Sequence, residues 1–91
     1  MFTILETKKY IKDIRKLQLE TLQNVRLNIY LQALRNGYRL DPAARCKKLR
    51  NEWSGFYEIS LGLDLRLIYR ISEDTLELIR IGTHAQLFRS L

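Results

Sequence analysis

Residues 64–82 read DLRLIYRISEDTLELIRIG, and their alternation of apolar and polar side chains decides the fold class. Successive side chains of a strand point to opposite faces of its sheet, so every second residue of DLRLIYRI shares one apolar face. These residues are Leu65, Leu67, Tyr69 and Ile71. The turn residues SEDT then lead into LELIRIG, which carries a second strand pattern. The stretch therefore predicts two antiparallel strands joined by a tight turn.

A further strand is predicted just before this hairpin, in GFYEISL at residues 55–61. Tyr57, Ile59 and Leu61 point to one side of the sheet, and Gly62 marks the next turn. In an antiparallel sheet one face commonly packs on the core while the other is solvated. The face that we expect to meet water or a ligand carries Glu58, Asp64, Arg66 and Arg80.

The first half of the chain predicts a short strand at residues 2–6 followed by two helices. Thr7 is a suitable N-cap for an amphipathic helix with a basic outer side over residues 8–17. Residues 20–35 predict a second, heavily buried helix that stops before Gly37. Its expected core stripe is Leu22, Val25, Ile29 and Ala33, widened by Leu27, Tyr30, Leu31 and Leu34. The short connection between the helices predicts an antiparallel helical hairpin that covers the sheet.

Composition limits the classes of function. With 91 residues, 46% of them hydrophobic, the chain is expected to form one domain, residues 1–91, of α+β class. A formal charge of +6 favours a polyanionic partner such as RNA, DNA or an acidic protein. A lone Cys46 and a lone His84 argue against a disulfide or a structural metal site, and no cofactor is expected.

The sequence also contains no run of about 18 apolar residues and no signal-peptide pattern at its start. We therefore expect a cytoplasmic protein without a membrane partner. The oligomeric state stays open.

Three segments resemble a known family: LRNEWSGFYEISL (49–61), DLRLIYRI (64–71) and LIRIGTHAQLF (78–88). The order of elements resembles the RelE/ParE superfamily of toxins from toxin-antitoxin pairs, and the segments are similar to its YafQ-like branch of RelE-type endoribonucleases. This resemblance implies a β-α-α-β-β-β fold with a short C-terminal segment. It also implies cleavage of mRNA, generally in the ribosomal A site, through metal-independent attack of a ribose 2′-hydroxyl on the neighbouring phosphate, and inhibition by a cognate antitoxin.

The resemblance also implies roles for individual residues. His84 matches the histidine of the family's terminal GTH motif, and Phe88 matches the aromatic residue that follows it. Arg66 matches a catalytic arginine, while Glu58 and Asp64 match acidic positions. The sequence departs from the branch where two further histidines are usual, near Ser60 and Lys47.

Cleavage of RNA by its own 2′-hydroxyl needs a base, a cation for the phosphate and an acid for the leaving 5′-oxygen. Glu58 or Asp64, Arg66 or Arg80, and His84 are the respective candidates. Phe88 is a candidate for stacking on a base. The segment ARCKKLR supplies candidate phosphate contacts in Arg45, Lys47, Lys48 and Arg50.

Two other functions fit the sequence. A ParE-like inhibitor of DNA gyrase would share the fold without needing a ribonuclease site. A catalytically degenerate member would bind RNA or an antitoxin only. Whether the toxin cleaves mRNA or inhibits gyrase, we expect its antitoxin to lay an acidic helix or strand over the basic surface of the toxin.

Overall fold

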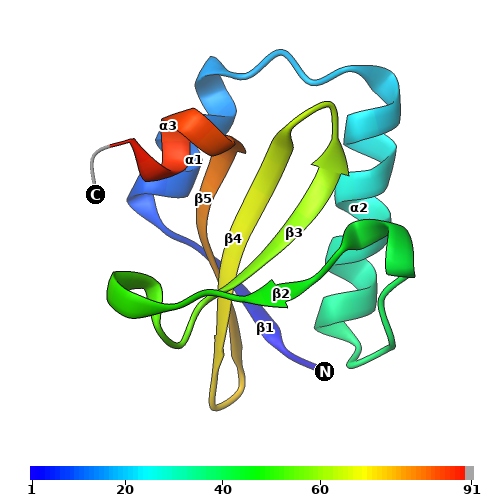
Figure 1. Cartoon of the computed structure of the whole chain (residues 1–91). Helices are drawn as coiled ribbons and strands as arrows, with labels where there is room; N and C mark the ends of the chain where they lie inside the picture. The colour runs from blue at the N-terminus through cyan, green and yellow to red at the C-terminus, as the bar shows by residue number, and fades with distance from the viewer. Residues whose placement is uncertain (90–91) are drawn as a thin grey trace.

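The computed structural model describes residues 1–89, which form a five-stranded sheet with helices packed against it (Figure 1). The strands are β1 (Thr3–Glu6), β2 (Lys47–Lys48), β3 (Tyr57–Gly62), β4 (Leu65–Ser72) and β5 (Thr75–Thr83). The helices are α1 (Lys8–Lys16), α2 (Thr21–Arg35) and α3 (His84–Phe88), with single 3₁₀ turns η1 (Pro42–Ala44) and η2 (Asn51–Trp53). The α+β class and the predicted order of elements are confirmed.

The sheet has the strand order β1-β5-β4-β3-β2. The β4–β5 hairpin is antiparallel, with Ser72 opposite Thr75 across its turn, and β3 pairs antiparallel with the other side of β4. The N-terminal strand β1 lies parallel to β5 and closes that edge. The alternation in residues 64–82 therefore locates the centre of the sheet, as predicted.

Helix α1 begins where the sequence predicts. The Thr7 hydroxyl oxygen accepts a hydrogen bond from the Tyr10 amide, which is an N-cap, and the same hydroxyl donates to the Leu78 carbonyl. At α2, Glu20 and Gln23 form a reciprocal capping box. Among the described residues, no helix is long and apolar enough to cross a membrane.

The two longer helices run in opposite directions (Figure 1), but they pack mainly on different strands of the sheet and not against each other, as the predicted helical hairpin would require. Helix α1 packs mainly on β5 and α2 on β3. The core between helices and sheet is fully buried at its centre. Its members include Tyr10 of α1, Leu27, Tyr30 and Leu34 of α2, and Ile59, Leu61, Leu67 and Ile81 of the sheet.

The predicted core stripe of α2 is wrong. Leu22, Val25 and Ile29 are 57%, 46% and 58% exposed, whereas three of the residues predicted to widen the stripe, Leu27, Tyr30 and Leu34, are buried together with Gln23. The helix is apolar on nearly every side, so its periodicity does not distinguish the face that meets the sheet. The outward apolar residues border a groove of about 750 Å³ that Leu40 and Pro42 also line.

The segment ARCKKLR contains a short strand that the sequence does not predict. Lys47 and Lys48 form the short edge strand β2, with Lys47 opposite Glu58 and Lys48 opposite Tyr57. Two residues are too short to carry an alternating pattern, so no sequence signal marks this strand. The pairing nevertheless brings a lysine beside a buried glutamate.

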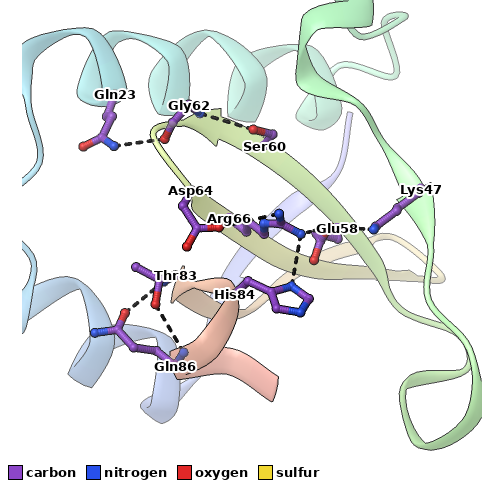
Figure 2. A network of polar contacts seen from close by, with 10 residues as sticks. All are labelled: Gln23, Lys47, Glu58, Ser60, Gly62, Asp64, Arg66, Thr83, His84 and Gln86. Carbon is purple, nitrogen blue, oxygen red and sulfur yellow. Dashed lines mark hydrogen bonds and ion pairs between the residues drawn. The ribbon is translucent and has the colours of Figure 1, made fainter. Parts of the chain in front are cut away.

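A tight turn joins β3 to β4 and fixes Asp64 at the sheet's end. Leu63 and Asp64 both have positive φ, of 50° and 64°, as the two central residues of a type I′ hairpin turn do. Gly62 also has a positive φ, and an added Cβ there would clash with Nη1 of Arg26. Gln23 donates to the Gly62 carbonyl, so α2 holds this turn in position (Figure 2).

Burial of two tyrosines predicts a loss of stability at alkaline pH. Burial, with a smaller contribution from Glu6, raises the pKa of Tyr10 to about 12. Burial also raises the pKa of Tyr69, and its hydrogen bond with Cys46 adds to the effect. In the unfolded chain a tyrosine ionises near pH 10, so the stabilisation by the neutral phenols is complete below pH 10 and is lost as pH rises through 12.

We therefore expect the melting temperature to fall more steeply between pH 10 and 12 in the wild type than in Tyr10→Phe, whose ring cannot ionise. Melting curves by circular dichroism across this range test the expectation. Tyr38→Phe is the control, because Tyr38 is 70% exposed. Parallel curves for all three proteins would contradict the assignment.

Candidate functional site

The site is centred on the guanidinium of Arg66 in β4, which contacts three candidate residues at once (Figure 2). Its Nη1 donates to Oε2 of Glu58 at 3.2 Å and lies 3.2 Å from Nδ1 of His84. Its Nη2 lies 3.5 Å from Oδ1 of Asp64. Three residues predicted from the sequence, Glu58, Asp64 and His84, therefore meet around one cation.

Glu58 anchors this cluster from β3. Its side chain is 5% exposed, and its Oε2 also faces the Lys47 ammonium at 3.4 Å. Its other oxygen, Oε1, is buried without a hydrogen-bond partner among residues 1–89. Two cations thus compensate a buried carboxylate, of which one oxygen has no hydrogen-bond partner in the described part of the chain.

The central part of this sheet face is covered rather than open, in contrast to the prediction that it meets water or a ligand. Glu58 is nearly buried, and Ile68, its direct neighbour in the register, is fully buried. The accessible groups lie at the margin, where His84 and Asp64 are exposed and Arg66 is partly exposed. A substrate would therefore meet Arg66, Asp64 and His84 before it met Glu58.

His84 is held at the first position of α3. Thr83 is the N-cap, its hydroxyl accepts from the Gln86 amide, and Gln86 Oε1 accepts from the Thr83 amide in return. A guanidinium can only donate hydrogen bonds, so its contact at Nδ1 requires an unprotonated lone pair on that atom. The contact is therefore a hydrogen bond in the tautomer that carries its proton on Nε2.

Phe88 lies one helical turn after His84, and the ring centroids are 4.9 Å apart. The other side of Phe88 meets Trp53 of η2, at 5.8 Å and nearly edge to face. Trp53 is partly exposed, and its ring also packs on Phe56 at 5.4 Å. The aromatic residue predicted to stack on a base therefore stands beside the imidazole and is braced by tryptophan.

The structure does not bring Arg80 into the cluster. Its Nε and Nη2 donate to the two carboxylate oxygens of Asp13 in α1, at 2.6 and 3.1 Å, and this hydrogen-bonded pairing raises the pKa of Arg80. Asp13 also accepts from the Ile81 amide, next to the irregularity where β4 and β5 change register. Sequence reasoning missed Asp13, because 67 residues separate it from Arg80 and no local pattern connects them.

The other predicted basic contacts surround the site at different depths. Lys47 joins the site by its ion pair with Glu58. The side chain of Lys48 points to the opposite side of β2, because successive side chains of a strand alternate. Arg45 precedes β2 in the sequence and Arg50 follows it, and both are exposed. Of the four, only Lys47 contacts a residue of the Arg66 cluster in the described part of the chain.

The cluster can perform acid-base chemistry on an anion. Among residues 1–89, no group of three or more histidine, cysteine, aspartate or glutamate side chains is arranged to hold a metal ion. A guanidinium offers two parallel donors to a phosphate, and the groups on its two sides, Asp64 and His84, can accept and donate protons. This is the donor set that phosphodiester cleavage requires.

Comparisons with known proteins identify the family of the chain. The sequence profile of the family described as "Bacterial toxin of type II toxin-antitoxin system, YafQ" matches residues 2–89. A comparison with curated protein sequences gave no significant match. Three solved structures are instructive.

A copper-bound mutant toxin from Helicobacter pylori is 33% identical, with a TM-score of 0.89 over 97% of this chain and 100% of its own. YafQ from E. coli strain BL21(DE3) is 25% identical, with a TM-score of 0.85 over 97% of this chain and 99% of its own. YafQ in the E. coli DinJ-YafQ complex is 26% identical, with a TM-score of 0.82 and the same coverage. The chain belongs to the YafQ family of type II toxin-antitoxin toxins, within the RelE superfamily.

Proposed function

We propose that this toxin is an endoribonuclease that cleaves mRNA, in association with the ribosome in the cytoplasm, and so stops translation. The observation that carries the proposal is the position of Arg66, whose guanidinium lies between an exposed carboxylate and an exposed imidazole beside Phe88. The other candidates for the same fold, gyrase inhibition and binding without catalysis, do not require this combination.

Each group has a defined part in the proposed reaction. The Asp64 carboxylate takes the proton of a ribose 2′-hydroxyl, and the 2′-oxygen attacks the adjacent phosphorus. The Arg66 guanidinium binds the phosphate oxygens, on which charge accumulates in the transition state. The bond to the 5′-oxygen breaks, and that oxygen leaves with a proton from His84. The products are a 2′,3′-cyclic phosphate and a 5′-hydroxyl.

The shared contact of Arg66 couples substrate binding to the state of His84. A phosphate competes with Nδ1 of His84 for the Nη1 donor of Arg66. Once the guanidinium turns to the phosphate, Nδ1 is free to take a proton, and the imidazolium can then donate from Nε2. Glu58, buried and bound to both Arg66 and Lys47, is a positioning residue in this scheme.

The test is to induce the protein in a bacterial host and to map new RNA 5′ ends by primer extension, together with plasmid supercoiling. We expect cuts inside translated messages and unchanged supercoiling. Growth arrest with intact messages and altered supercoiling would assign the chain to gyrase inhibition. Binding to RNA without cuts or arrest would identify a degenerate member.

We also propose that a cognate antitoxin binds and neutralises this toxin. The proposal is made by analogy with the solved complex of E. coli YafQ with DinJ. The exposed apolar side of α2 is the candidate docking face. Its outward residues Leu22, Val25 and Ile29 carry no charge, and the groove beside them is lined by two cations, Arg26 and Arg39, against one carboxylate, Asp41. An apolar centre with a basic border fits an amphipathic helix with acidic flanks.

Ile29→Asp is therefore expected to weaken antitoxin binding by at least about 30-fold, the effect of losing a central apolar anchor. Its toxicity should persist, because Ile29 is 58% exposed and belongs to the helix face that points away from the sheet. Rescue of growth by co-expressed antitoxin, followed by calorimetric titration, measures both effects. Leu5→Asp is the matched control, since Leu5 is 49% exposed on β1. Equal neutralisation of the two variants would rule out this face.

A further inference from the structure

A continuous row of rings and cations leads away from the Arg66 cluster, and the reaction proposed above does not use its far end. From His84 the row continues through Phe88 at 4.9 Å, Trp53 at 5.8 Å and Phe56 at 5.4 Å. It ends where the guanidinium of Arg70 lies 5.0 Å from the ring centroid of Phe56. Four separate segments of the chain supply these side chains, and the three aromatic rings after His84 are all partly exposed.

This row follows the same face of the sheet as the candidate catalytic residues. Phe56 precedes Glu58 by two positions, and Arg70 follows Arg66 by four positions on β4. Side chains an even number of positions apart share a face of the sheet, so these four side chains lie on one face. At a rise of about 3.3 Å per residue, the α-carbons of Arg66 and Arg70 are about 13 Å apart. This distance corresponds to about four stacked base steps of 3.4 Å along a nucleic acid strand.

The far end has the chemistry of a site for a nucleotide. Arg70 is 43% exposed, and its Nε and Nη2 donate to the carboxylate of Glu77 at 2.8 and 3.1 Å, which fixes the plane of the guanidinium. Its Nη1 makes no hydrogen bond among residues 1–89. A hollow of about 310 Å³ borders Phe56 at the β2 edge of the sheet, and its lining also includes Lys48 and Tyr57, which belong to the opposite face. An aromatic ring, a fixed cation and adjacent open space are the parts of a single-strand stacking site.

Trp53 has a different role within the row. It stands edge-on between Phe56 and Phe88, and its Nε1 is buried without a hydrogen-bond partner in the described part of the chain. A buried donor of this kind cannot read an RNA base. Trp53 is therefore a positioning residue that holds the two phenylalanine rings at a fixed separation.

We infer that Phe56 and Arg70 bind a second nucleobase and its phosphate on a single-stranded RNA whose scissile phosphate lies at Arg66. The inference rests on the proposed ribonuclease function and extends it. A short substrate would fill only the Arg66 and His84 end, whereas an RNA several nucleotides longer would reach Phe56. The ligand of this far end is any unpaired base, because stacking is tolerant of sequence.

Binding of 2′-O-methyl RNA separates this inference from cleavage, since that RNA lacks the nucleophile. We would measure an octanucleotide by fluorescence anisotropy and a dinucleotide by NMR titration. Phe56→Leu retains apolar volume but removes the ring, so it should weaken octanucleotide binding by about 5- to 150-fold and leave dinucleotide binding unchanged. Phe56→Tyr should bind like the wild type, and so should Tyr38→Leu, which removes an exposed ring outside the row.

Arg70→Gln is the second variant, in case Phe56→Leu fails to fold. It should weaken octanucleotide binding and lower the slope of log affinity against log salt by about 0.7, the value of one phosphate contact on a single strand. Unchanged octanucleotide binding in the folded variants would reduce Phe56 to a packing residue and overturn the inference. The protein could also cut no RNA and yet bind the octanucleotide in a way that depends on Phe56. That outcome would support the inference and contradict the endoribonuclease proposal.

Discussion

Substitution of His84 by alanine should lower the rate of RNA cleavage by about 10²- to 10⁴-fold, the usual contribution of a positioned acid or base. The imidazole is exposed, and the N-cap of α3 is formed by Thr83 and Gln86, so the helix does not depend on it. The loss should therefore come from chemistry and leave the melting temperature almost unchanged. Single-turnover cleavage of a short labelled RNA, with thermal melting alongside, measures both.

His84→Gln distinguishes a proton carrier from a group that merely orients Arg66. A glutamine oxygen can still accept the hydrogen bond that Arg66 now donates to Nδ1, but it cannot carry a proton to the leaving oxygen. We expect His84→Gln to be as slow as His84→Ala, because neither side chain can carry a proton to the leaving oxygen. Activity close to wild type in His84→Gln would leave His84 only an orienting role.

Much of the fold follows from local pattern. Residues 64–82 carry an alternation with one turn signal, interrupted at Ile68 and Ile79, and a one-residue slip would turn most of the apolar side chains outward, so the pairing of the hairpin is strongly specified despite one register irregularity. Thr7 predicts the start of α1 because a hydroxyl at that point satisfies an amide of the first turn. In both cases the deciding interaction lies within a few residues, where the sequence displays it.

Other features depend on contacts between distant segments and were not predictable in this way. The face of α2 that meets the sheet is chosen by β3, and the apolar residues all round the helix conceal that choice. Arg80 turns to Asp13 because α1 packs beside β5, across 67 residues of chain. For the site, family resemblance identified Glu58, Arg66 and His84, but only the structure reveals that one nitrogen of Arg66 serves two of them.

Replacement of Arg66 should lower both the rate of cleavage and the free energy of unfolding, each for a different reason. Loss of a preorganised cation at a developing negative charge costs about 10²- to 10³-fold in rate. Arg66→Ala also leaves the buried Glu58 carboxylate with Lys47 alone, which should lower the free energy of unfolding by about 1 to 3 kcal/mol. Arg66→Lys should restore part of the stability but little activity, because an ammonium cannot offer two parallel donors.

The double variant Arg66→Ala with Glu58→Gln separates the two routes. Glu58→Gln removes the uncompensated charge, so urea denaturation should give a free energy of unfolding above that of Arg66→Ala alone. Its cleavage rate should nevertheless stay as low as that of Arg66→Ala, because no cation meets the phosphate. Recovery of cleavage in the double variant would mean that Arg66 acts only by neutralising Glu58. The direct role of Arg66 at the phosphate, from which the proposed mechanism starts, would then be lost.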